Sequence, residues 1–215
     1  DGRLIPILNR LFADRPQVTV VHGDALKVDL KELMVRHLGS ARRYSVVANL
    51  PYYATSPILM RLLEERLPLD RIVVMIQKEV ADRIMAEPGT KEYGSLSVAV
   101  RYFADVFWVC SVPRNCFVPR PQVDSAVISL RIRREPLVSV RNEDLFFRVV
   151  RAGFFQRRKT LANALSAAFF GGKGKAELGN LLKETGIDPN RRGETLTLEE
   201  FARLSDVLDQ KLVKP

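Results

Sequence analysis

The sequence predicts an α/β fold followed by a smaller region that is entirely helical. In residues 1–134, short runs rich in β-branched residues alternate with helical patterns, which is typical of a sheet with parallel strands. From about residue 135 onward, apolar residues recur only at helical spacing. We therefore expect an α/β domain over residues 1–134 and a helical domain over residues 135–215.

Five runs are expected to form strands. Three of them are apolar, as strands buried on both faces of a sheet should be, and each is followed by a polar residue. These three are residues 18–22, 44–48 and 71–76. The other two, residues 106–110 and 125–133, flank a proline-rich loop at 113–121 and are expected to pair antiparallel.

Helices are expected between the strands and throughout the last third of the chain. Ser56 and Pro57 favour a helix start, because serine can cap free amides and proline is tolerated at the first helical position. Thr197 and Glu200 have the spacing of a capping box. The expected helices after residue 135 span 144–155, 158–169, 176–184 and 198–212, and the glycine-rich run 171–174 is interpreted as a loop.

Composition excludes several classes of protein. A hydrophobic content of 47% can build a core, which excludes wholesale disorder, and no apolar run is long enough to span a membrane. The two cysteines are too few for a disulfide scaffold and fit a reducing cytoplasm, where we expect the protein to act. The net charge of +9 indicates either a solvated basic surface or a face that binds RNA or DNA.

Polar residues follow the expected strands, where ligands bind in open parallel sheets. Asp24 follows the first run and either caps the next helix or contacts a ligand. Asn49, Leu50 and Tyr52 follow the second. The Asn49 amide oxygen and the Leu50 carbonyl could accept both N–H groups of an exocyclic amine while Tyr52 stacks on the attached ring. The alternative is an ordinary turn at the proline.

Several separate motifs, in order along nearly the whole chain, resemble one family. They are Asn-Leu-Pro-Tyr-Tyr at 49–53, Gln-Lys-Glu-Val-Ala at 77–81, Tyr-Gly-Ser-Leu-Ser at 93–97, Phe-Val-Pro-Arg-Pro-Gln-Val-Asp-Ser-Ala-Val at 117–127, Phe-Phe-Gln-Arg-Arg-Lys-Thr-Leu at 154–161 and Arg-Arg-Gly-Glu-Thr-Leu at 191–196. This set resembles the KsgA/RsmA family of small-subunit ribosomal RNA adenine-N6,N6-dimethyltransferases.

The resemblance implies a Rossmann-like domain that uses S-adenosylmethionine as cofactor, and a helical domain that docks on ribosomal RNA. It implies two methyl transfers to each of two adjacent adenines near the 3′ end of small-subunit rRNA. Asn49, Leu50 and Tyr52 match the motif that holds the target adenine, and Phe117 matches the aromatic residue that closes on its other face. Asp24 matches the residue that binds the cofactor's adenine, and Asn49 also lies near the methyl donor in that family.

Basic residues near these motifs are candidates for RNA contact. Arg157, Arg158 and Lys159 lie in a family-like motif beside two phenylalanines, although such a run could be only a solvated helix start. Arg114 and Arg120, near Phe117, are candidates for the target strand. The two histidines have no partner at metal-ligand spacing, so no metal site is expected. We expect a monomer whose partner is small-subunit rRNA within the assembling (pre-30S) subunit, and no membrane partner.

The chain departs from the family at its start. No Gly-x-Gly-x-Gly follows a strand, and no acidic ribose-binding residue is present, so we expect an incomplete amino-terminal segment and weak cofactor binding. Two alternatives stay open. One is an Erm-type large-subunit rRNA methyltransferase, which has a similar Asn-x-Pro-Tyr motif, and the other is a non-catalytic small-subunit assembly factor.

Overall fold

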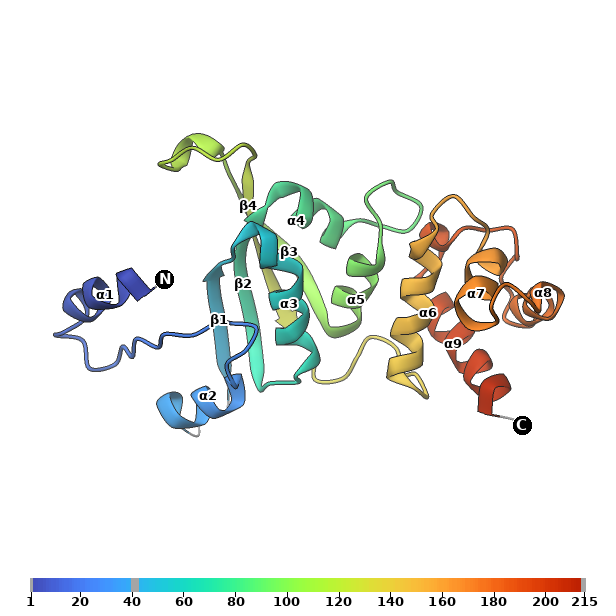
Figure 1. Cartoon of the computed structure of the whole chain (residues 1–215), viewed down its shortest axis with the longest axis horizontal. Coiled ribbons are helices and arrows are strands. Elements are labelled where there is room, and N and C mark those ends of the chain that lie inside the picture. The colour runs from blue at the N-terminus through green and yellow to red at the C-terminus, as the bar shows by residue number, and fades with distance from the viewer. Residues whose placement is uncertain (1, 40–42, 214–215) are drawn as a thin grey trace.

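A mixed four-stranded sheet forms the centre of the protein in the computed structural model, which describes residues 2–39 and 43–213 (Figure 1). The strand order is β1-β2-β4-β3, with β1 parallel to β2 and β4 antiparallel to both of its neighbours. The strands are β1 (Tyr44–Asn49), β2 (Leu69–Gln77), β3 (Ala104–Val112) and β4 (Ser125–Ile132). These bounds confirm four of the five expected strands and the antiparallel pairing of the last two.

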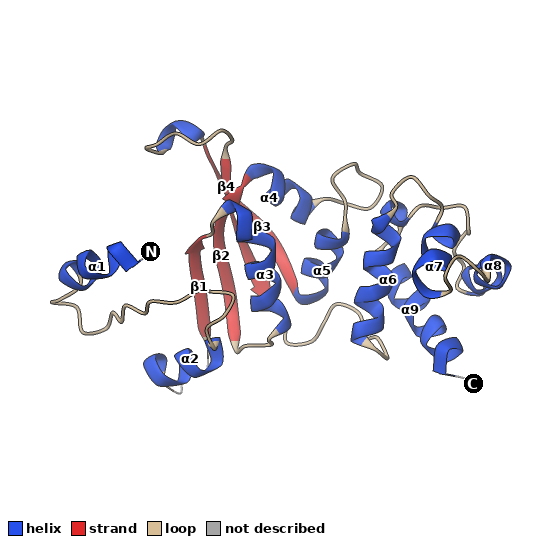
Figure 2. Cartoon of the chain, viewed as in Figure 1, coloured by secondary structure: helices blue, strands red, loops and turns tan. Residues whose placement is uncertain are grey.

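Helices cover one face of this sheet. The helices α3 (Thr55–Glu64), α4 (Lys78–Met85) and α5 (Ser95–Phe103) lie along it, and the side chains of Ile72 and Val74 beneath them are fully buried (Figure 2). Alternate residues point to the other face. There, Val47 of β1 is 81% exposed, so the expected burial on both faces is wrong for β1, whereas Val73 and Met75 of β2 are half-buried.

The expected strand at 18–22 is absent, which corrects the sequence prediction. Residues 12–29 connect the helices α1 (Ile5–Leu11) and α2 (Leu30–Leu38) without any strand. The Val18 amide donates to the Arg15 carbonyl and so closes a turn instead of joining a sheet. A strand exists only where a neighbouring strand accepts its hydrogen bonds, and no described residue supplies one here.

Four helices follow the sheet, as expected: α6 (Glu143–Phe155), α7 (Leu161–Phe169), α8 (Lys175–Glu184) and α9 (Leu198–Val213). The capping box of α9 is confirmed, because the Thr197 amide donates to the Glu200 carboxylate at 2.9 Å and the Glu200 amide to the Thr197 hydroxyl at 3.3 Å. The glycine-rich run 171–174 is a loop, as predicted.

Two helix starts differ from their predictions. Helix α7 begins at Leu161, so Arg158 and Lys159 lie in the turn that precedes it and not in the helix. Helix α3 begins at Thr55 and has no side-chain cap, so Ser56 does not act as the cap and Pro57 is the third helical residue. Proline is tolerated there because amides of the first turn have no partner within the helix.

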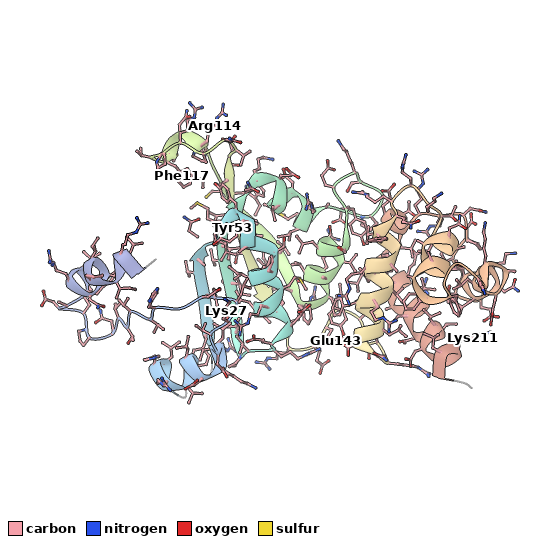
Figure 3. The ribbon with its side chains drawn as sticks, in the orientation of Figure 1. Lys27, Tyr53, Arg114, Phe117, Glu143 and Lys211 are labelled. Atoms are coloured by element: carbon pink, nitrogen blue, oxygen red, sulfur yellow. The ribbon has the colours of Figure 1, made fainter. Side chains whose placement is uncertain are left out.

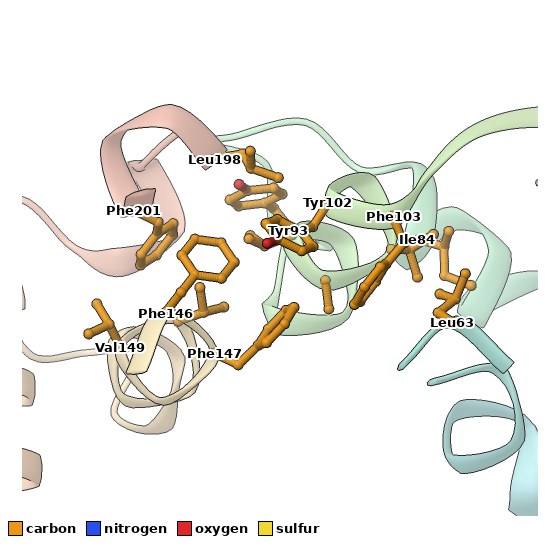
Figure 4. Packing of buried hydrophobic residues seen from close by; sticks show 14 of the residues in the cluster. Leu63, Ile84, Tyr93, Tyr102, Phe103, Phe146, Phe147, Val149, Leu198 and Phe201 are labelled. Atoms are coloured by element: carbon orange, nitrogen blue, oxygen red, sulfur yellow. The ribbon is translucent and has the colours of Figure 1, made fainter. Parts of the chain in front are cut away.

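The hydrophobic core runs without a break from the sheet's helices into the helical region (Figure 4). Tyr102 of α5 stacks on Phe146 of α6 with 5.1 Å between ring centroids. The Tyr93 hydroxyl donates to the Leu196 carbonyl at 2.9 Å, and burial raises the pKa of Tyr93, which keeps this donor protonated. The two regions therefore pack as one body, and the expected domain boundary at residues 134 and 135 stays a prediction.

Candidate functional site

Asn49 ends β1 at the carboxyl edge of the sheet, and the chain turns sharply after it. The Leu50 amide still donates to the Met75 carbonyl of β2 at 3.1 Å, and the Leu50 side chain is buried. Pro51 cannot continue the ladder because it has no amide hydrogen. Its carbonyl accepts the Ala54 amide at 3.0 Å and the Thr55 hydroxyl at 3.1 Å. The backbone after Asn49 is thus held in one conformation.

Tyr52 is fixed by a contact with β4. Its hydroxyl lies 2.7 Å from the Oγ of Ser125, the first residue of β4, which is fully buried. Ser125 pairs with Gln77 in the ladder between β2 and β4, so the contact is set by the sheet register. The neighbouring Tyr53 is 91% exposed and points into solvent. Of the two adjacent tyrosines, only Tyr52 is held by the sheet.

The loop between β3 and β4 is tied closed at its base by Asp124. The Asp124 carboxylate accepts the Arg114 amide at 2.9 Å, and its carbonyl accepts the Lys78 amide at 3.0 Å. The Arg114 guanidinium donates to the Gln122 carbonyl at 3.2 Å. The loop carries Phe117, which Figure 3 shows beyond the end of the sheet on the same side as Tyr53.

A small cavity of about 260 Å³ joins these parts. Asn49, Leu50 and Tyr52 line it from β1 and the turn, and Phe117 lines it from the loop. The volume is below the roughly 300–1,000 Å³ typical of sites for drug-sized ligands. A site of this size, with one amide and two aromatic rings, suits a single planar base. The structure therefore brings together all four residues expected to hold the target adenine.

Asp24 lies apart from that cavity. Its carboxylate accepts the Leu26 amide at 2.9 Å and lies 3.8 Å from the Lys27 ammonium, on an exposed turn. Arg61 of α3 holds the same turn by donating to the carbonyls of residues 25 and 28 at 2.8 and 2.7 Å. In Figure 3, Lys27 lies toward the opposite end of the sheet from Phe117. Asp24 acts as the cap of its own turn.

The five predicted RNA contacts are not equivalent. The Arg157 guanidinium donates to the carbonyls of Lys91 and Tyr93, at 2.7 and 3.2 Å, and lies 3.0 Å from the Glu194 carboxylate. Arg157 thus ties α6 to two loops, and Arg114 likewise closes its own loop. Arg120, Arg158 and Lys159 are exposed, and their side chains have no hydrogen-bonding or charged partner within the described ranges. Of the five predicted contacts, these three are therefore the ones whose charge is available to an external anion.

Sequence reasoning assigned no role to Ser125 or Asp124. Both lie within the Val-Asp-Ser-Ala-Val segment at 123–127, so the motif was visible, but its contacts were not. A pair of polar residues at the start of an otherwise apolar strand is the signal that could have pointed to them. What that pair contacts depends on the sheet register and on the fold of the loop.

The described residues contain neither a metal-binding cluster nor a helix that could span a membrane. No group of three or more histidine, cysteine or acidic side chains within them could hold a metal ion, and both cysteines are free thiols on the surface. None of the described helices is long and apolar enough to cross a bilayer.

Comparison with known proteins assigns the family. A family model described as "Ribosomal RNA adenine dimethylase" matches residues 1–210. The chain belongs to the ribosomal RNA adenine dimethylase family. It is 54% identical over 209 residues to "Ribosomal RNA small subunit methyltransferase A" of Bacillus mycoides (strain KBAB4), and equally to the protein of that name in Bacillus cereus (strain AH187). Each alignment covers 97% of this chain and 72% of the relative.

Solved structures of more distant proteins have the same fold. A dimethyladenosine transferase from Plasmodium falciparum superposes with a TM-score of 0.75 at 24% identity, over 95% of this chain and 78% of the other. The 23S rRNA methyltransferase ErmE superposes with a TM-score of 0.65 at 23% identity, over 98% of this chain and 80% of the other. Both matches confirm the expected α/β methyltransferase fold for this dimethylase.

The ribosomal RNA adenine dimethylase family uses S-adenosylmethionine, and two residues of this chain are expected to contact that cofactor. Asp24 and Asn49, the two residues expected to contact it, line no common cavity. The Asp24 carboxylate is engaged with the Leu26 amide in its own turn. Among the described residues of this dimethylase, Asp24 and Asn49 therefore do not meet in one site that could hold the cofactor.

Proposed function

We propose that this chain is a small-subunit ribosomal RNA adenine-N6,N6-dimethyltransferase. In this proposal it dimethylates two adjacent adenines near the 3′ end of the small-subunit rRNA during subunit biogenesis. The observation that carries the proposal is the cavity in which Asn49, Leu50, Tyr52 and Phe117 meet. Membership of the dimethylase family and 54% identity to proteins named small subunit methyltransferase A support it.

The residues of this chain act on the adenine side of the reaction. The Asn49 amide oxygen and the Leu50 carbonyl accept the two N–H groups of the exocyclic amine, while Tyr52 and Phe117 stack on the two faces of the base. Accepting both hydrogens draws the nitrogen lone pair out of conjugation with the ring. That lone pair is the nucleophile, and the contribution of these residues to the rate would be to hold it in a fixed orientation.

No general base is required of the protein. S-adenosylmethionine would supply a methyl group on a sulfonium, a strong electrophile, so no residue of this chain would have to remove a proton from the nitrogen first. The proton then leaves to water through the mouth of the cavity, since Asn49 is exposed. The protein's contribution is therefore to extract the base, fix its orientation and exclude competing geometries.

The proposed partner is small-subunit rRNA in the assembling subunit, met by a monomer in the cytoplasm. Arg120 lies near Phe117 on the loop, where it can contact the phosphates of the target strand. Arg158 and Lys159 offer cations on the helical region. Arg114 and Arg157 remain in the proposal as residues that hold the loop and the helical region in position.

Two other functions stay in view because specific observations favour them. The likeness to ErmE, with a TM-score of 0.65, fits a large-subunit rRNA methyltransferase as well as a small-subunit one. The separation of Asp24 from Asn49 fits a factor that binds the small subunit without methylating it.

One experiment distinguishes the three functions. The chain is incubated with saturating S-adenosylmethionine and with ribosomal subunits from cells that lack dimethyladenine, and the RNA is digested for mass spectrometry. Dimethyladenine in small-subunit RNA, lost in Asn49→Ala, is the expected result. Dimethyladenine in large-subunit RNA would support the Erm-type alternative. Small-subunit binding without any methylation would support the assembly factor. In each of these last two cases the proposal is wrong.

A further inference from the structure

We propose that the groove between α6 and α7 binds an unstacked nucleotide of RNA, with Phe155 as the stacking platform and with Arg148 and Arg151 as phosphate contacts. The proposal rests on the proposed function, because that function makes RNA the partner of this chain. It adds a binding site on the helical region, separate from the cavity around Asn49.

One face of α6 and one face of α7 form the groove. Arg148, Arg151 and Phe155 line it from α6 at spacings of three and four residues, so they lie on one face of that helix. The facing stripe of α7 contributes Ala167 and Ala168, whose small side chains leave a volume of about 290 Å³ open. A planar ring can enter such a groove without displacing any large side chain.

Phe155 is an exposed aromatic residue in this groove that the hydrophobic core does not require. It is the last residue of α6, and its side chain is 85% exposed. The preceding Phe154 packs against Phe201 and Tyr93, so the core is complete without Phe155. Proteins often bind single-stranded RNA through an exposed aromatic ring beside cations, because a base stacks on the ring while the phosphates approach the positive charges.

The charges of the groove select an anion. Arg148 lies over the ring of Phe169 with 5.1 Å between its guanidinium carbon and the ring centroid, which leaves its N–H groups free to donate. Arg151 is exposed and has no hydrogen-bonding or charged partner among the described residues. No acidic side chain lines the groove. Both guanidinium groups are therefore available for phosphate oxygens.

A larger groove nearby has a different charge. It has a volume of about 790 Å³ between α6 and the helices of the sheet, and its lining mixes Glu64, Glu79 and Glu92 with four basic residues, Arg151 among them. A phosphate backbone would meet carboxylates as well as cations there, whereas the smaller groove presents cations without carboxylates. The smaller groove is therefore the better RNA site by charge, although its volume is smaller.

The groove also lies where RNA that enters the candidate site could reach it. Phe155 is at the carboxyl end of α6, and the turn that follows carries Arg158 and Lys159. In Figure 1 this end of α6 and the loop at 113–121 both lie at the upper edge of the molecule. An RNA that runs along this edge of the molecule would pass both the loop at 113–121 and the carboxyl end of α6.

Crosslinking tests which class of molecule occupies the groove. A benzophenone side chain is placed at position 155 of the full chain, which is then irradiated with small ribosomal subunits. A crosslink to ribosomal RNA is the expected result. A crosslink only to a ribosomal protein, or no crosslink while the unchanged chain binds the subunit, would overturn the proposal. Failure of the chain to bind the subunit at all would also overturn it.

Affinity measurements test the roles of the side chains. The probe is a fluorescein-labelled RNA hairpin with the sequence of the small-subunit 3′ end. We expect Phe155→Ala to bind it about 5- to 100-fold more weakly and Phe155→Trp to retain binding. Arg151→Ala should lower the slope of log affinity against log salt by about 0.7 to 0.9. Matched controls are Phe107→Ala and Arg203→Ala, which remove an exposed ring and an exposed cation elsewhere and should bind normally.

The two proposals can fail separately. Dimethyladenine formation with unchanged affinity in Phe155→Ala and Arg151→Ala would overturn the groove and leave the proposed function intact. A crosslink from position 155 to ribosomal RNA without any dimethyladenine would support the groove and overturn the methyltransferase.

Discussion

The hydroxyl of Tyr52 lies 2.7 Å from the Oγ of Ser125, which follows it by 73 residues. Ser125 is fully buried at the start of β4, so the contact joins the turn after β1 to an inner strand of the sheet. Tyr52 can rotate about its side-chain bonds without this contact. We infer that Ser125 is a positioning residue, which holds the Tyr52 ring parallel to an incoming base.

Replacing Ser125 by alanine should therefore impair use of the RNA more than it impairs folding. We expect Ser125→Ala to lower the free energy of unfolding by about 0.5–1.5 kcal/mol, the usual contribution of one hydrogen bond. In methylation assays KM for the RNA should rise in Ser125→Ala, and Ser125→Thr should restore it. Adding Tyr52→Phe to Ser125→Ala should raise KM no further.

Ser129→Ala is the matched control, because the Ser129 hydroxyl on the same strand is buried with no partner among the described residues. Equal KM values for the two alanine variants would contradict the role of Ser125.

The backbones of Gly153 in α6 and Gly193 touch. A Cβ atom on Gly193 would lie 2.3 Å from the Gly153 carbonyl oxygen, and one on Gly153 would lie 3.1 Å from the Phe201 ring. Backbone atoms cannot move aside as a flexible side chain can, so alanine at 193 must displace the loop from α6. We expect Gly193→Ala to lower the free energy of unfolding by about 1–3 kcal/mol, measured by urea denaturation.

The control for that substitution is Gly179→Ala. Gly179 lies inside α8, and a Cβ atom there would meet nothing within 4 Å. Because alanine favours a helix over glycine, Gly179→Ala should raise the free energy of unfolding by about 0.5–1 kcal/mol. Equal destabilisation by both substitutions would contradict the backbone contact.

The sequence predicts elements better than it predicts contacts. The runs at 44–48 and 71–76 are strands as expected, but 18–22, with the same β-branched composition, is not. Composition is a local property, whereas a strand needs a hydrogen-bonded neighbour. The expected burial on both faces was wrong for β1 for a related reason, since burial depends on what packs against the sheet.

The sequence alone predicts part of the candidate site, and the resemblance to a family supplies the rest. Local spacing placed Asn49, Leu50 and Tyr52 together, but Phe117 is 65 residues beyond Tyr52 and joins them only through the fold of its loop. Arg157 has contacts that the sequence does not indicate. It belongs to a basic run and is exposed as such a run predicts, yet Glu194 and two carbonyls bind it, and none of them is near it in sequence.

Glu200 should make the helical region sensitive to acid. The Arg191 guanidinium, at 2.6 and 2.9 Å, and the Thr197 amide hold the pKa of Glu200 below its usual range. A carboxylate whose pKa is lowered by folding stabilises the protein above its unfolded pKa of about 4.3, and this stabilisation is lost as the pH falls through the folded value. We expect Glu200→Gln to lower the free energy of unfolding by about 1 kcal/mol at pH 7.

That difference between wild type and Glu200→Gln should begin to shrink below about pH 4.3, where Glu200 of the unfolded chain takes up a proton, and should go on shrinking as the pH falls toward the lower pKa of the folded state. Denaturation by urea at pH 7, 5 and 3.5 measures it. Glu199→Gln is the matched control, because Glu199 is exposed in the same helical turn and has no ion-pair partner among the described residues. A difference that is constant with pH, or equal for the two variants, would contradict the ion pair.

Calorimetric titration with S-adenosylmethionine tests the expectation of weak cofactor binding. The Asp24 carboxylate is satisfied by the Leu26 amide on an exposed turn, and it lines no cavity with Asn49. Binding at Asp24 would require that hydrogen bond to break and the turn held by Arg61 to move. We expect a dissociation constant of about 1 mM or weaker, equivalent to about −4 kcal/mol, and no further loss in Asp24→Asn. The Bacillus cereus relative, titrated in parallel, should bind more tightly. Micromolar binding by this chain that Asp24→Asn abolishes would show that the turn rearranges to form the site.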